Sequence, residues 1–125
     1  MTINQSFVVE LHTQLIQRFG GETGIRDYQI LDSCIQSIYQ TFDQKELYPS
    51  VIEKATRLAF NLITSHPFID GNKRIGMHML IFYLKYENLA FNPAVEEIIK
   101  VGFSIAKGKL TYEKLIIWVK LQISK

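Results

Sequence analysis

Cysteine, proline and long apolar runs are scarce in this sequence. Cys34 is the only cysteine, so no disulfide can form within the chain, and its apolar neighbours predict a buried thiol. The longest apolar run, residues 79–84, is far too short to span a membrane. The N-terminus has no basic leader followed by an apolar stretch, so we expect no signal peptide. These absences favour a protein of the reducing cytoplasm.

The chain nevertheless has enough apolar residues for one core. Its 125 residues are 47% hydrophobic and 21% charged, which is ordinary for a soluble protein and predicts a single domain over residues 1–125. The net charge of +2 is too small to indicate nucleic-acid binding by itself and too small to exclude it.

Apolar residues recur at three- and four-residue spacing, which predicts amphipathic helices. We expect them over residues 7–19, 28–38, 51–65, 72–88, 93 to about 108, and 112–123. No stretch alternates as the strand of a sheet would, and residues 41–49 predict an irregular loop or a short hairpin. The expected fold class is all-α, a compact irregular bundle of five or six helices.

Helix starts are marked by capping residues. Asp27 and Thr111 are expected N-caps, because their side chains can accept hydrogen bonds from the first free N–H groups. Ser50 and Glu53 have the spacing of a capping box. Asn92-Pro93 is expected to cap and start the fifth helix, since proline is well tolerated at the first helical position.

The connection HPFIDGNKR, residues 66–74, concentrates polar chemistry between two apolar helices. A structural interpretation is available for most of it: Asp70 or Asn72 could cap the next helix, and Phe68 could anchor the loop in the core. Lys73 and Arg74 fit this interpretation poorly. They lie in the first turn of a helix, where the macrodipole already places positive charge, so an anion is the natural compensation.

The same residue types suit a phosphate ligand. Free N–H groups at a helix start bind phosphate, Gly71 allows close approach, and Lys73 and Arg74 add a point charge and a bidentate fork. Asp70 offers a hard oxygen for Mg²⁺, and His66 is the type of side chain that acts as general base near pH 7. Together they predict a site for phosphoryl or nucleotidyl transfer.

The stretch resembles the signature loop of the Fic/Doc family, H-P-F-x-D/E-G-N-x-R, and all seven specified positions match. GGETGIRD, the LYP segment and the EKA helix start are similar to the death-on-curing (Doc) branch of small toxins, so the likeness covers roughly residues 8–90. Lys73 is Doc-like, whereas Pro67 and Gly71 are typical of the adenylyl-transferring Fic branch.

The resemblance implies a nucleotide-dependent enzyme of the Fic/Doc fold. A Doc-like toxin would transfer the γ-phosphate of ATP to a threonine or serine of a target protein such as translation elongation factor Tu. The alternative is an adenylyltransferase that attaches AMP. The implied cofactors are ATP (or another nucleoside triphosphate) and Mg²⁺. The implied catalytic residues are His66, Asp70, Lys73 and Arg74, with Asp70 on the metal; the implied nucleotide-binding residues are Gly71, Asn72, Lys73 and Arg74.

The resemblance also implies a flap and a partner. A hairpin within residues 38–49 would clamp the target by strand addition. The inhibitory pattern S/T-x-x-x-E-G/N of many Fic proteins is absent, because the residue four before Glu87 is Tyr83. Control by a separate antitoxin similar to Phd is therefore expected, with no role for a membrane.

Four residues outside the loop receive a structural interpretation. His78 is expected to be partly buried, Lys54 and Arg57 to lie on a solvated face, and Trp118 in the core or on a partner surface. His12 has no expected partner. Two other functions stay open: a nucleic-acid-acting toxin, and a catalytically silent binding module that keeps the loop for its shape. No basic stripe interleaved with aromatic residues supports the first.

Overall fold

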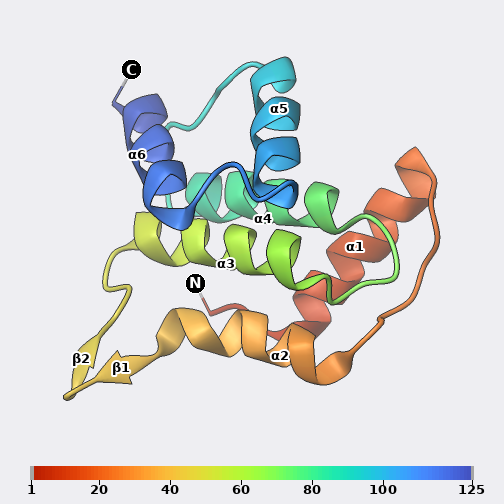
Figure 1. Ribbon diagram of the computed structural model, residues 1–125, viewed down its shortest axis with the longest axis horizontal. Helices are drawn as coiled ribbons and strands as arrows, with labels where there is room; N and C mark the ends of the chain where they lie inside the picture. Colours follow the sequence, from red (N-terminus) through yellow and green to blue (C-terminus); the bar gives the residue numbers. More distant parts are fainter. Residues whose placement is uncertain (1, 125) are drawn as a thin grey trace.

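The computed structural model describes residues 2–124 and confirms an all-α bundle with a short hairpin (Figure 1). Among the described residues, no helix is both long and apolar enough to cross a membrane. The elements are α1 (Gln5–Phe19), α2 (Tyr28–Gln36), the 3-10 turn η1 (Ser37–Tyr39), β1 (Thr41–Phe42), β2 (Lys45–Glu46), α3 (Val51–Ser65), α4 (Asn72–Tyr86), α5 (Val95–Ala106) and α6 (Tyr112–Ile123).

Helices α3 and α4 form the centre of the molecule. They pack along each other in the middle of Figure 1, with α1 and α2 on one side and α5 and α6 on the other. Gly76 permits this close packing, because a Cβ there would lie 2.5 Å from Ile63 Cγ1. Both helices bury leucine, isoleucine or methionine on their facing sides, including Leu58, Leu62 and Leu80.

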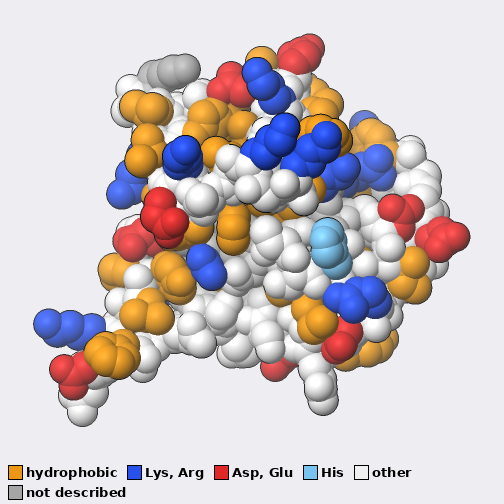
Figure 2. All heavy atoms as spheres, in the orientation of Figure 1, with side chains coloured by type: hydrophobic (Ala, Val, Ile, Leu, Met, Phe, Trp, Pro, Cys, Tyr) orange, Lys and Arg blue, Asp and Glu red, His pale blue; other side chains and the backbone are white. Residues whose placement is uncertain are grey.

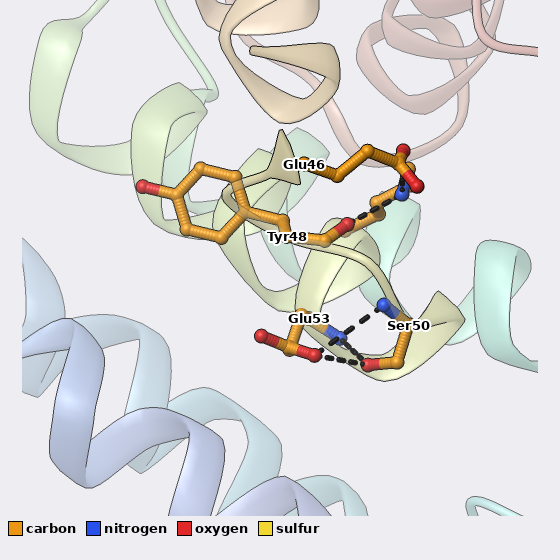
Figure 3. A network of polar contacts seen from close by, with 5 residues as sticks. Glu46, Tyr48, Ser50 and Glu53 are labelled. Carbon is orange, nitrogen blue, oxygen red and sulfur yellow. Dashed lines mark hydrogen bonds and ion pairs between the residues drawn. The ribbon is translucent and has the colours of Figure 1, made fainter. Parts of the chain in front are cut away.

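Three of the four expected helix starts are confirmed. Asp27 Oδ1 accepts hydrogen bonds from the N–H groups of Gln29 and Ile30, and the Thr111 side chain accepts from the N–H of Lys114. Figure 3 shows the Ser50–Glu53 capping box, in which each side chain accepts from the other residue's N–H. Local spacing alone therefore set these helix starts.

The predicted start at Asn92-Pro93 is wrong. Helix α5 begins at Val95, and Ala94 occupies the N-cap position without a side-chain bond. Phe91 is buried and packs edge-on against Trp118, with ring centroids 5.6 Å apart. This tertiary anchor holds the connection extended past Pro93, so the helix starts two residues later than the local signal indicated. Trp118 itself lies partly in the core, as expected.

The hairpin projects from the bundle at the lower left of Figure 1. Thr41 pairs with Glu46 and Phe42 with Lys45, and the two turn residues between the strands have positive φ. Its base is tied to α3 by the Lys54 ammonium, which binds the Glu46 carboxylate at 2.8 Å and the carbonyl of Tyr48. The predicted solvated position of Lys54 is therefore wrong, because its side chain is only 12% exposed.

Candidate active site

The signature loop connects α3 to α4 and is fixed in the core by Phe68. This side chain is 1% exposed, as the sequence predicted. The aromatic ring of His12, from α1, stacks on it with 3.8 Å between ring centroids and 9° between planes. His12 is itself buried, and its Nε2–H donates to the carbonyl of Asp70 at 2.7 Å. The middle of the loop is thus held from α1.

The segment between α1 and α2 lies alongside the loop and pairs with its backbone. Ile25 and Phe68 form an antiparallel bridge, and the N–H of Ile69 donates to the carbonyl of Gly24 at 3.1 Å. The N–H of Arg26 donates to the carbonyl of Pro67 at 2.8 Å. Backbone pairing of this kind fixes the loop's path without using its side chains.

His66 closes α3 in a left-handed conformation, with φ 51° and ψ 58°. Such a conformation is uncommon outside glycine, and it holds when neighbouring contacts over-determine it. Arg26 supplies those contacts: its Nε donates to the His66 carbonyl at 2.6 Å and its Nη2 to the Ser65 carbonyl at 2.9 Å. The His66 side chain is exposed and makes no hydrogen bond with any described residue, so its imidazole is available to a substrate.

Asp70 does not cap α4, contrary to one interpretation of the sequence. Its Oδ2 accepts from the N–H of Glu22 at 3.0 Å, and its Oδ1 accepts from the N–H of Gly71 at 2.8 Å. These two bonds, with the positive charge of Arg74 nearby, lower the pKa of the Asp70 carboxyl below its usual value of 3.8. The carboxylate is ionised at neutral pH and retains free lone pairs on both oxygens.

The metal-binding capacity of this region rests on one carboxylate. Within residues 2–124, no three His, Cys, Asp or Glu side chains converge as a metal-binding cluster. Mg²⁺ is commonly held by one or two carboxylates together with phosphate oxygens and water. Asp70 therefore fits a metal that arrives with a nucleotide rather than one bound by the protein alone.

The start of α4 offers unused backbone donors. Gly71 is the N-cap in a left-handed conformation, and its own N–H is engaged by Asp70. Among the described residues, the N–H groups of Asn72, Lys73 and Arg74 have no hydrogen-bond partner. They are the first-turn donors that commonly bind phosphate.

The Asn72 side chain holds the loop in place. Its Oδ1 accepts from the N–H of Phe68 and its Nδ2 donates to the carbonyl of Phe68, both at 3.0 Å. This reciprocal pair fixes the turn between Phe68 and α4. The Asn72 side chain is therefore engaged with the backbone of Phe68, and the backbone N–H of Asn72 is the donor that remains for a ligand.

The two cations of the motif have different neighbours. Arg74 reaches back toward α1, where it donates to the Gly20 carbonyl at 3.2 Å and lies over the Phe19 ring at 5.1 Å. The Lys73 ammonium lies over the Phe103 ring at 5.1 Å, and Lys107 lies over the same ring at 4.4 Å. Figure 2 shows Lys and Arg side chains gathered where the end of α5 meets the start of α4.

Comparison with known proteins identifies the family of this chain. The model of the Fic/DOC family matches residues 2–84, more than half of the chain. The chain belongs to the Fic/Doc family. It is also similar to a protein named Toxin Doc from Mycolicibacterium smegmatis (strain ATCC 700084 / mc(2)155), with 39% identity over 56 residues. That alignment spans 45% of this chain and 43% of the relative.

The Fic/Doc match ends before α5 begins, yet α5 reaches the signature loop. Phe103 and Lys107 lie outside the matched residues. The ammonium groups of Lys73 and Lys107 both lie over the Phe103 ring. The loop motif gave no signal for these two residues.

The contact of His12 with the loop was also not predicted. Its position among Val8, Leu15 and Ile16 on the buried side of α1 does indicate a buried histidine. His78 is half-buried, and this burial lowers its pKa below the usual 6.5.

Proposed function

We propose that this protein is a Doc-like toxin that transfers the γ-phosphate of ATP to a serine or threonine hydroxyl of a target protein, such as translation elongation factor Tu. The observation that carries the proposal is the placement of Lys73 beside the unpartnered N–H groups of the α4 first turn. The family assignment and the similarity to a protein named Toxin Doc support it.

The phosphate groups would bind at the start of α4. The N–H groups of residues 72–74 and the macrodipole favour negative charge there. Lys73 and Arg74 make no ion pair with any described residue, so both positive charges are available to phosphate oxygens. Gly71 precedes these donors in a left-handed conformation, with φ +79°, which glycine adopts without strain.

Asp70 would hold the metal that accompanies the nucleotide. Its ionised carboxylate faces the same end of α4, held by the N–H groups of Glu22 and Gly71. Bound Mg²⁺ would neutralise phosphate charge as the leaving group departs. The oxygens of Asp70 already have one protein donor each, which orients the carboxylate for this role.

His66 would activate the acceptor hydroxyl. Its exposed imidazole takes the hydroxyl proton as the oxygen bonds to the γ-phosphorus. The bond between that phosphorus and the bridging oxygen to the β-phosphate breaks, and ADP leaves with the electron pair. Arg26 fixes the His66 backbone, so the ring is attached at a defined point at the end of α3.

Lys73 would decide which phosphate is transferred. Adenylyl-transferring relatives have glycine at this position, which leaves the backbone N–H groups open. In this chain a lysine side chain begins in the first turn of α4, and its ammonium lies over the Phe103 ring of α5. A side chain there would favour a reversed triphosphate that presents its γ-phosphate to His66.

The test uses ATP labelled on either the γ- or the α-phosphate, incubated with bacterial lysate, Mg²⁺ and purified protein. We expect γ-label on one band near the size of an elongation factor, and no label with His66→Ala. Lys73→Gly is the second variant, and we expect it to slow γ-transfer at least about tenfold or to change the transferred group. Lys85→Gly removes a similar charge from the far end of α4 and should leave transfer unchanged.

Each other outcome has a defined meaning. Transfer of α-label would show adenylyl transfer, in agreement with Pro67 and Gly71. No label from either sample would favour a nucleic-acid-acting toxin or a silent binding module, and RNA cleavage and ATP-dependent thermal shift would separate the two. If Lys73→Gly keeps both the group and the rate, the proposed role of Lys73 is wrong.

The proposed toxin would be neutralised by a separate antitoxin similar to Phd. The support is the family assignment, the name of the similar Doc protein, and the missing inhibitory pattern around Glu87. Co-expression of a Phd-like antitoxin should relieve any growth inhibition that this protein causes, and the two proteins should purify as a complex.

A further inference from the structure

A cleft of about 670 Å³ lies between α2 and α3, apart from the phosphate site. Its volume is within the range of sites that accept a ligand or a side chain. Helix α2 contributes Ile30 and Ser33, η1 contributes Ser37, and α3 contributes Arg57, Asn61 and Ser65. Most of these groups are hydroxyls and amides, so the cleft offers hydrogen bonds as well as charge.

Arg57 is the cation of this cleft, and it has no anionic partner. Its guanidinium lies over three rings: Tyr112 at 5.0 Å, Phe60 at 5.5 Å and Tyr48 at 5.6 Å. Its Nε is buried without a hydrogen bond, and among the described residues the side chain forms no hydrogen bond or ion pair. The predicted solvated position is wrong, because the rings hold this charge in place.

Two carboxylates of this region, Glu53 and Asp27, already accept hydrogen bonds. Glu53, one turn earlier on α3, accepts from Ser50 in the capping box. Asp27, at the rim of the cleft, caps α2 with its Oδ1. A guanidinium that has unused donors and no ion pair with any described carboxylate is a site for an external anion.

The cleft also connects the hairpin with the general base. At one end, Asn61 Nδ2 binds the Ser37 hydroxyl at 2.6 Å, just before the hairpin begins. At the other end, Ser65 lines the cleft and precedes His66 in the chain. A target segment that extends from the hairpin to His66 would therefore pass over Arg57.

We propose that Arg57 binds an aspartate or glutamate side chain of the target segment, and so selects the hydroxyl that is modified. This inference rests on the proposed function, since it supplies the specificity of the same transfer. Arg57 would act as a binding residue for the substrate, outside the reacting groups. The serine and asparagine side chains of the cleft would bind the same carboxylate or the nearby backbone.

The helix geometry sets the expected spacing. His66 is nine positions after Arg57, which corresponds to about 13 Å along α3 at 1.5 Å per residue. An extended peptide covers this distance in about four residues, at 3.3 Å each. The acidic side chain should therefore lie about four residues from the acceptor hydroxyl, within a tolerance of one residue.

The test is a binding measurement that needs no transfer. Fluorescent peptides carry one central threonine and a single glutamate placed in turn at each position on either side. A second set carries glutamine, and a third lysine, at the same positions. Fluorescence anisotropy at low salt should show that glutamate about four residues from threonine binds about tenfold more tightly than glutamine there.

Charge exchange separates recognition from a structural role. Arg57→Gln should remove the preference for glutamate, and Arg57→Glu should make the lysine peptide the tighter ligand at the same position. Lys85→Gln, which removes an exposed charge elsewhere, should keep the wild-type preference. Should these Arg57 variants fail to fold by circular dichroism, Arg57→Lys keeps the charge without the fork and should reduce the preference.

Two results would overturn the proposal. One is a wild-type protein with no position at which glutamate exceeds glutamine, which needs no variant to observe. The other is an unchanged glutamate preference in folded Arg57→Gln. Both results can be told apart from failure of the proposed function, because peptide binding is also measured with His66→Ala. That variant should keep the preference for glutamate over glutamine, whether or not the wild-type protein transfers label.

Discussion

The signature loop and the hairpin are attached to the same helix, but the fold holds them very differently. Residues 66–71 are bound through backbone and side chain by partners from α1 and the segment 20–27. The four strand residues of the hairpin are all exposed, and Phe42 is 76% exposed. One connection is thus held by many contacts, while the other leaves its strand edges exposed.

This difference indicates which of the two connections needs a stable structure before a ligand binds. Groups that act on a phosphate must keep their geometry before the substrate arrives, and that requires buried supports. A segment that adds a target strand gains its missing hydrogen bonds only on binding. Changes to the supports of the loop should therefore cost far more stability than changes to the hairpin.

The largest expected effect is that of His12→Ala. It removes the ring stacked on Phe68 and leaves the Asp70 carbonyl without its donor, in a buried site. We expect a loss of about 2–4 kcal/mol in the free energy of unfolding, measured by urea denaturation. Gln17→Ala, on the exposed side of the same helix, should change it by less than about 0.5 kcal/mol. Equal effects for both would mean that the loop does not depend on α1.

An intermediate effect is expected for Gly71→Ala. The backbone there has φ +79°, so alanine should cost about 1–2 kcal/mol in the same assay, and its Cβ would also approach Ile16. Gly108→Ala is a matched control, because its φ is +74° with nothing within 4 Å of a new Cβ. The excess cost at Gly71 measures the packing between the loop and α1. If Gly108→Ala costs as much, that packing contributes nothing.

The smallest effect is expected for Lys54→Met at the base of the hairpin. The lost ion pair with Glu46 is partly exposed, so the global cost should be less than about 1 kcal/mol. Local opening should increase instead, and hydrogen exchange of residues 41–47 should become faster while α3 and α4 keep their protection. Lys45→Met removes a hairpin charge without this tie and should leave the exchange rates unchanged. Equal protection in Lys54→Met would show that Lys54 does not hold the hairpin.

The sequence predicted features that depend on neighbours along the chain. The caps at Asp27 and Thr111 and the Ser50 capping box need partners only a few residues away, and Phe68 was recognisable as an apolar residue in a polar loop. Residue types in the signature loop also indicated the family to which the chain belongs. These are the features for which spacing and local physics are sufficient.

Contacts across long separations were not predictable in this way. The partner of His12 is 58 residues away, and that of the Arg26 side chain is 40 residues away. Arg57 looks like a surface residue until Tyr48 and Tyr112 come together around it. The late start of α5 has the same origin, since Phe91 is fixed by Trp118 in another helix. Only the assembled bundle determines these positions.

The hydrogen bond between the Glu22 N–H and Asp70 has a consequence for folding. It joins residues 48 positions apart, and His12 and Arg26 make similar long-range bonds to the loop. Contacts of this separation form late, once the chain has paid the entropy of closing a large loop. A partly folded chain would thus carry the signature residues without their arrangement. Any activity of the signature loop would therefore appear only after these long-range contacts have formed.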